Sequence, residues 1–123
     1  MLINKNKGLV FSSKEKICIT LLTQILGLMF RKRQNMVMIF PQERRVSLHM
    51  LMVFYPIDVL LLNEQLEIIE IRRDLLPFSF WSPANKGKYI IELGKKDSKK
   101  KARDCDVGDT IKILSSESIP ENN

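Results

Sequence analysis

From Met36 onward the chain is a succession of short β-favouring runs separated by turn residues, and this pattern limits the possible folds more than any other feature. The runs cover residues 36–40, 46–54, 57–62, 66–72, 89–93 and 107–114, and residues 16–20 form an earlier one. The crossover helices of a doubly wound sheet are missing between the runs from Met36 onward, so the pattern disfavours that fold. We predict a mainly β (α+β) fold: a small, partly open β-barrel or sandwich of six to seven short strands with one or two short helices.

Three local patterns refine this prediction. Thr20 can cap a helix whose apolar residues, between Leu21 and Met29, fall on one face. Residues 46–62 are apolar on both faces, and Tyr55-Pro56 offers a turn, which predicts a central, covered hairpin. In residues 66–71, Leu66 and Ile68 share one face whereas Ile69 and Ile71 take the other, which indicates a bulge or an edge strand.

The length fits one domain, which we place at residues 1–114, followed by a polar tail at 115–123 that we expect to be disordered. Residues 1–16 hold no compact apolar segment of the kind that directs export. Both longer apolar stretches are interrupted by polar residues, so they predict core rather than membrane spans. Cys18 and Cys105 lie far apart and suit reduced thiols. We therefore expect a cytoplasmic protein that does not act at a membrane.

The charge of the chain is concentrated in one segment. Lys and Arg number 20 against 14 Asp and Glu, and residues 95–103 alone hold six basic residues and one acidic residue. That segment has a net charge of +5, which leaves +1 for the remaining 114 residues. Weak, non-specific nucleic-acid binding is one alternative function, although no aromatic residue interleaves the run and a solvated helix face is the simpler interpretation. The candidate residues are Lys95, Lys96, Lys99, Lys100, Lys101 and Arg103.

Four polar residues lie within or beside apolar runs: Arg31, His49, Asp58 and Glu92. Burying charged groups is costly unless they are paired or bound. If the strands bring them together, they form a ligand pocket in which Arg31 clamps an anionic group and His49 and a carboxylate bond the ligand. The alternative is an internal network that holds the fold together. The main functional prediction is a non-catalytic module that binds a small ligand or a protein partner, both unidentified.

An enzymatic role, using His49 and the carboxylates, is a second alternative, and the sequence leans against it. His49 is the only histidine, and no serine or cysteine nucleophile motif accompanies it. The positions of the five glycines allow no phosphate-binding loop. Five methionines between Met29 and Met52 could in principle bind Cu(I), but their spacing suits core packing better. We therefore predict no cofactor, no metal and no catalytic residues.

Phe78, Phe80 and Trp81 lie between two prolines in a segment that reads as a loop or an edge. Such aromatic residues can line a ligand cleft or a partner surface. Alternatively, they can pin the loop onto the rest of the domain.

Several motifs carry a family resemblance. They are Gly27-Leu28-Met29-Phe30-Arg31, the strand at 36–41, Ser47-Leu48-His49-Met50, Pro56-Ile57-Asp58, the strand at 89–93 and Val107-Gly108-Asp109. In this order, over about residues 20–113, they resemble domain of unknown function family 192. His49-Met50 resembles the archaeal type, whose members usually lack an export signal. The resemblance implies a compact β-rich fold and no known reaction, cofactor or substrate. Gln24 replaces a usual Arg, and the basic segment 95–103 departs from the family pattern.

Overall fold

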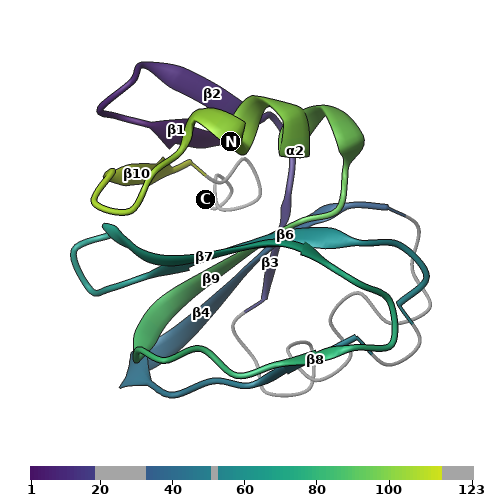
Figure 1. Ribbon diagram of the computed structural model, residues 1–123. Helices are drawn as coiled ribbons and strands as arrows, with labels where there is room; N and C mark the ends of the chain where they lie inside the picture. The colour runs from purple at the N-terminus through teal and green to yellow at the C-terminus, as the bar shows by residue number, and fades with distance from the viewer. Residues whose placement is uncertain (19–32, 51–52, 115–123) are drawn as a thin grey trace, which may run out of the picture.

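The computed structural model describes residues 1–18, 33–50 and 53–114, which form ten strands, one α-helix and one 3-10 helix (Figure 1). The mainly β prediction is confirmed, although the described strands outnumber the six or seven expected. The elements are β1 (Leu2–Asn4), β2 (Leu9–Ser12), β3 (Lys16–Cys18), β4 (Asn35–Arg44), β5 (Leu48–His49), β6 (Ile57–Leu62), β7 (Ile68–Leu75), β8 (Phe80–Trp81), β9 (Gly87–Leu93), α2 (Lys96–Lys101), η1 (Ala102–Asp104) and β10 (Ile111–Ile113).

A five-stranded sheet of order β3-β4-β9-β6-β7 forms the middle of the molecule. One face is covered by α2 and the three-stranded sheet β10-β1-β2, and we call this the α2 side (Figure 1). The other face is covered by the ribbon β5-β8 and the chain around it, and we call this the β8 side. Each side holds its own hydrophobic core. In the described part of the chain these sheets stay open and close no barrel.

The apolar segment at 46–62 does not form the predicted hairpin. β5 pairs with β8 in the outer ribbon, whereas β6 pairs with β7 and β9 in the central sheet, so the two strands are not paired with each other. β6 itself is central and all six of its residues are buried, as expected for a strand that is apolar on both faces.

The phase slip in residues 66–71 is both a bulge and an edge. β7 is the last strand of the five-stranded sheet, and its register jumps between Leu62↔Ile68 and Leu61↔Glu70. Ile68 packs on the α2 side and Ile69 on the β8 side, as alternation requires. The extra residue then returns Ile71 to the α2 side, so Ile71 does not share a face with Ile69 as the sequence suggested.

The basic segment forms α2, but its expected position in solvent is wrong. Ser98 and Ala102, four residues apart on one face, are buried against the rest of the domain. The N-cap is Lys95, and no side chain caps the helix. The helix is instead fixed by Asn35 of β4, whose Nδ2 donates to Ser98 Oγ at 2.8 Å.

The predicted helix at 21–29, Arg31 and the tail at 115–123 lie outside the described residues. In the described part of the chain, neither helix has the length and apolar character needed to cross a membrane.

Candidate functional site

The structure separates the two buried carboxylates that the sequence singles out. Asp58 and Glu92 are 3% and 6% exposed, as residues within apolar strands should be. In the β6–β9 ladder, however, Asp58 pairs with Leu93 and Val59 pairs with Glu92. Because successive strand residues point to opposite faces, Asp58 lies on the α2 side and Glu92 on the β8 side. One small ligand therefore cannot contact both carboxylates directly.

Asp58 belongs to an internal network. Its Oδ1 accepts the backbone N–H of Asp74 at 2.8 Å, where β7 bulges and Asp74 takes a φ of 50°. Its Oδ2 lies 3.6 Å from Nη1 of Arg73. The same guanidinium donates to the carbonyl oxygens of Ala102 and Cys105, at 3.0 and 3.1 Å. Asp58 thus connects the edge strand β7 to the end of η1, which matches the network alternative for this residue.

Glu92 has different surroundings. Its ladder neighbours are Met36 and Val59, and the core on this side is apolar. Among the described residues, no side chain or backbone group forms a hydrogen bond or ion pair with its carboxylate. Burial without a compensating charge raises the pKa of Glu92 to about 7. Glu92 can therefore hold or release a proton near neutral pH.

A second buried polar group without a hydrogen-bond partner belongs to Gln34, and no sequence pattern indicated it. Gln34 precedes β4, and its carbonyl oxygen accepts the backbone N–H of Gly94 at 3.0 Å, two positions beyond Glu92 on β9. Gln34 Nε2 is buried and has no hydrogen-bond partner. By strand alternation, Gln34 and Glu92 are diagonal neighbours on the β8 side. A carboxylate and an amide N–H, the first an acceptor and the second a donor, thus face the same region.

The backbone of His49 lies on the same side of the sheet as Glu92. β5 pairs with β8 in the register His49↔Phe80, and the flanking Leu48 and Met50 pack into the β8-side core. The side chain of His49, like the whole of Arg31, lies outside the described residues. The grouping of Arg31, His49 and Glu92 stays a prediction.

In the aromatic loop, Trp81 is packed against the domain, whereas Phe78 and Phe80 are exposed. Trp81 packs against the β8-side core, and the backbone N–H of Phe78 donates to the carbonyl of Met50 at 2.8 Å. Phe54 and Phe78 meet edge to face, with ring centroids 5.4 Å apart. Four apolar side chains here, which we call the aromatic patch, are more than half exposed: Phe54, Leu76, Phe78 and Phe80.

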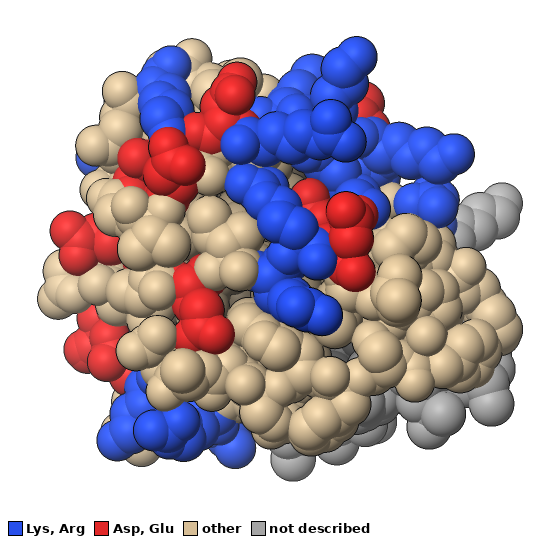
Figure 2. All heavy atoms as spheres, viewed as in Figure 1, with Lys and Arg blue, Asp and Glu red and all other residues tan. Residues whose placement is uncertain are grey.

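The basic residues of the α2 segment are not equivalent. Lys96, Lys100, Lys101 and Arg103 are exposed, whereas Lys95 and Lys99 are half-buried. Lys99 Nζ is 3.0 Å from Asp74 Oδ1, and this ion pair lowers the pKa of Asp74. Figure 2 shows Lys and Arg side chains gathered over α2 at the top of the molecule.

A lysine-centred cluster joins the β1–β2 turn to the loop after η1. Lys7 Nζ lies 2.6 Å from Asp106 Oδ2 and 2.9 Å from Asp109 Oδ2, and it also bonds the carbonyl of Asp104. These bonds raise the pKa of Lys7 above its usual range. Burial opposes ionisation of Asp109, but hydrogen bonds from Asn4, the Asp106 backbone and Lys7 lower its pKa to about 2.

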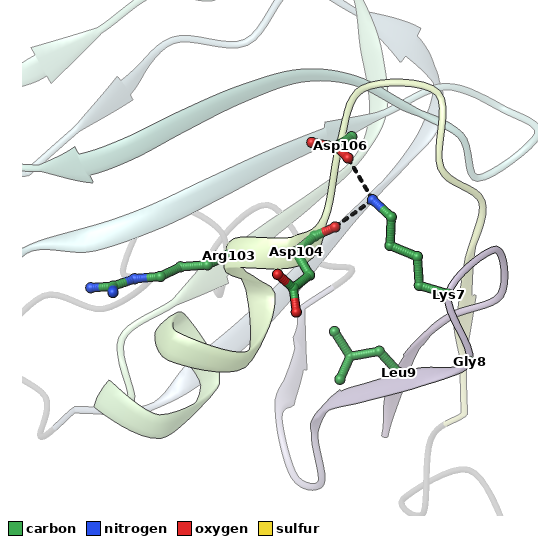
Figure 3. A pocket seen from close by; sticks show the side chains of 6 residues that line it. All are labelled: Lys7, Gly8, Leu9, Arg103, Asp104 and Asp106. Atoms are coloured by element: carbon green, nitrogen blue, oxygen red, sulfur yellow. Dashed lines mark hydrogen bonds and ion pairs between the residues drawn. The ribbon is translucent and has the colours of Figure 1, made fainter.

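The same residues border an open surface hollow of about 460 Å³ (Figure 3). It is lined by Lys7, Gly8, Leu9, Arg103, Asp104 and Asp106. The ammonium of Lys7 already lies between the carboxylates of Asp106 and Asp109, so these groups are paired with one another and connect the β1–β2 turn to the loop after η1. In the described ranges, no set of three or more His, Cys, Asp or Glu side chains is placed to hold a metal ion.

The three sheets, the short helix and the motif positions define a small mainly β domain, and comparisons with known proteins agree. Residues 3–113 match the family model DUF192, described as "Uncharacterized ACR". The chain belongs to this family, domain of unknown function family 192, as the motifs indicated.

The similar proteins include UPF0127 proteins of archaea. One from Thermococcus sibiricus is 38% identical over 96 residues, which cover 75% of this chain and 62% of that protein. One from Pyrococcus furiosus is 33% identical over 94 residues, covering 74% and 80%. The chain thus spans less than two thirds of the length of the first relative.

Two crystal structures share the fold. A protein of unknown function from Novosphingobium aromaticivorans aligns with a TM-score of 0.70 at 16% identity, covering 80% of this chain and 74% of the other. A putative transcription regulator from Sinorhizobium meliloti aligns with a TM-score of 0.70 at 22% identity, covering 78% of each chain. At these identities, the similarity establishes the fold alone.

Proposed function

We propose that this protein is a non-catalytic module that binds a small ligand on the β8 side of the central sheet, at Glu92. The observation that carries the proposal is a carboxylate that is 6% exposed, has the apolar ladder neighbours Met36 and Val59, and has no partner among the described residues. Burying such a group costs free energy, and none of the described residues offsets that cost with a hydrogen bond or ion pair, which is typical of sites that recover it on binding. A ligand ammonium or other N–H donor satisfies Glu92, and a ligand acceptor satisfies Gln34 Nε2.

Arg31 and His49 keep their predicted roles in this proposal. Arg31 clamps an anionic group of the ligand and His49 adds a hydrogen bond. A ligand that carries an ammonium for Glu92 and an anionic group for Arg31 is a small zwitterion. Asp58 is excluded from the site because it faces the α2 side and binds Asp74 and Arg73.

A matched set of three-carbon probes tests this site. Propylamine, propionate and β-alanine are compared by thermal shift at pH 8 on the wild type and on Glu92→Gln. We expect propylamine and β-alanine to raise the Tm of the wild type and not of Glu92→Gln. Glu64→Gln, which changes an exposed carboxylate in the β6–β7 turn, is the control and should respond like the wild type.

The pH dependence adds an independent readout. An ammonium ligand prefers the ionised carboxylate, so its affinity for the wild type should rise between pH 6 and pH 8. Equal Tm shifts in the wild type and Glu92→Gln, or no shift by any probe, would remove Glu92 as the binding group.

A protein partner at the aromatic patch is a second candidate function. Exposed apolar side chains that contact one another mark contact surfaces in soluble proteins, and here Phe54 and Phe78 meet edge to face. Backbone hydrogen bonds hold the loop that presents Phe78. A photo-crosslinking residue at position 80 should give a discrete adduct in cells. Position 107, where Val107 is 63% exposed at a distant loop, is the control. Excess wild type should abolish the adduct, and excess Phe78→Ser/Phe80→Ser should not. The same adduct at both positions would contradict a specific surface.

We place this module in the cytoplasm. Support comes from Cys105, a buried free thiol whose pKa is raised chiefly by burial, which suits a reducing compartment.

A further inference from the structure

The outer face of α2 carries a row of basic side chains, and the opposite face of the helix is held against the domain by packing and hydrogen bonds. Ser98 and Ala102 are buried beneath the helix, and Asn35 bonds both Ser98 Oγ and the backbone N–H of Lys95. Lys96 and Lys100, one helical turn apart, therefore point away from the core. Arg103 follows about one turn later and is also exposed. A row on a fixed helix loses less conformational entropy on binding than a flexible basic tail.

Of the six basic residues in this segment, Lys95 and Lys99 are half-buried and the other four are exposed. Lys99 is engaged internally, since its Nζ bonds Asp74 Oδ1 at 3.0 Å and the carbonyl of Pro56 at 3.4 Å. Lys101 Nζ lies 3.8 Å from Asp97, but both side chains are more than half exposed, so this pair is weak. Lys96, Lys100 and Arg103 are left as the outward-facing cations.

The chemistry of this row favours one kind of partner. Its cations repeat about every turn of helix, with neighbouring Cβ atoms about 6 Å apart, which suits a polyanion with closely spaced charges. No aromatic side chain lies between residues 95 and 104, so the stacking that holds single strands is missing. The rest of the chain is nearly neutral, which concentrates the positive potential over α2 (Figure 2).

We propose that Lys96, Lys100 and Arg103 form a docking surface for the phosphate backbone of duplex nucleic acid, without base recognition. This surface lies on the α2 side, away from Glu92, so the proposal does not depend on the small-ligand site. Contacts of this kind displace counterions, and each neutralised phosphate contributes about −0.9 to the slope of log K against log salt. Three cations predict a slope of roughly −3.

Fluorescence anisotropy with a labelled 20-base-pair DNA duplex, at several salt concentrations, tests the proposal. We expect Lys96→Gln/Lys100→Gln/Arg103→Gln to weaken binding by about tenfold or more at low salt and to flatten the salt slope. Lys5→Gln/Lys86→Gln/Lys112→Gln removes the same charge from exposed positions elsewhere and should retain most of the affinity.

Lys99→Gln is a second control. It removes an internally bonded lysine, so it should lower the free energy of unfolding and leave DNA affinity nearly unchanged. Three results would overturn the proposal: no binding by the wild type at low salt, equal losses in the two triple variants, or stronger binding to phosphatidylserine vesicles than to the duplex.

Discussion

The two sides of the central sheet treat buried polar groups in opposite ways. On the α2 side, Asn4, Asn35, Asp58 and Asp109 each have hydrogen-bond partners from other elements. On the β8 side, Glu92 and the Nε2 atom of Gln34 have none among the described residues. Satisfied polar groups fix one arrangement of the chain, whereas unsatisfied groups lower its stability. The described polar groups of the α2 side therefore stabilise the fold, whereas burial disfavours the ionised carboxylate of Glu92 on the β8 side.

The largest expected effect comes from breaking the α2 side at Asn35. Its Nδ2 donates to Ser12 and Ser98, and its Oδ1 accepts the backbone N–H groups of Gly94 and Lys95. Asn35→Ala leaves several buried groups without partners and should lower the free energy of unfolding by about 4 kcal/mol. Urea denaturation measures the loss.

Asn85→Ala provides the matched control because Asn85 is exposed and bonds only Glu70 on the surface. We expect it to change the unfolding free energy by less than about 0.5 kcal/mol. A loss of similar size in both variants would mean that the buried Asn35 network adds nothing to stability.

On the β8 side, Glu92→Gln should do the reverse and stabilise the protein. The pKa of Glu92 is raised to about 7 from its ordinary 4.5, so the folded state binds a proton that the unfolded state has released between these values. The stability of the wild type should therefore fall as the pH rises from about 4.5 to 7. One pKa unit corresponds to about 1.4 kcal/mol, so Glu92→Gln should gain about 3 kcal/mol at pH 8.

At pH 4, where Glu92 is protonated in both states, the variant and the wild type should unfold at nearly the same urea concentration. Unfolding curves at pH 4, 6 and 8 measure this difference. A pH-independent effect of the substitution would show that the Glu92 carboxylate is already paired when folded.

The sequence predicted the central strands well because their apolar runs are unambiguous. β6 has the predicted bounds, 57–62, and the slip in β7 corresponds to a real bulge. β1 and β2 were missed because three- and four-residue strands, joined by a turn rich in Lys and Asn, give no clear periodicity. The hairpin at 46–62 was wrong because a continuous apolar run does not specify which strands pair.

The candidate site could be predicted only in part for a related reason. That Asp58 and Glu92 are buried follows from the apolar runs around them. The face on which each residue lies depends on the strand register, because a shift of one position moves its side chain to the opposite face of the sheet. The ladder pairs Asp58 with Leu93 rather than with Glu92, and no local pattern encodes that register.

Asp58→Ala sharpens the comparison because it removes a carboxylate from the α2 side alone. The backbone N–H of Asp74 and the guanidinium of Arg73 both lose a partner, so we expect a loss of about 2 kcal/mol in unfolding free energy. Hydrogen exchange should accelerate at Asp74 and in η1. The Tm shift caused by propylamine should remain, since Asp58 faces away from Glu92. If Asp58→Ala abolished that Tm shift, Asp58 and Glu92 would belong to one site, contrary to the separation described above.

The smallest expected effect concerns Asp109, whose titration runs opposite to that of Glu92. Its pKa is lowered to about 2 from 3.8, so the folded state stays ionised where the unfolded state takes up a proton. This contribution is present above about pH 4 and is lost as the pH falls through 2. After allowance for solvent screening, we expect Asp109 to contribute about 1 kcal/mol to the free energy of unfolding.

Asp109→Asn should therefore destabilise the protein at pH 6 and have little effect at pH 2. Asp106→Asn, in the same lysine cluster but with a side chain 76% exposed, should destabilise the protein less than Asp109→Asn at pH 6. If Asp109→Asn still loses stability at acid pH as the wild type does, Asp109 is not the source of that pH dependence. The contrast between the α2 side and the β8 side would then fail.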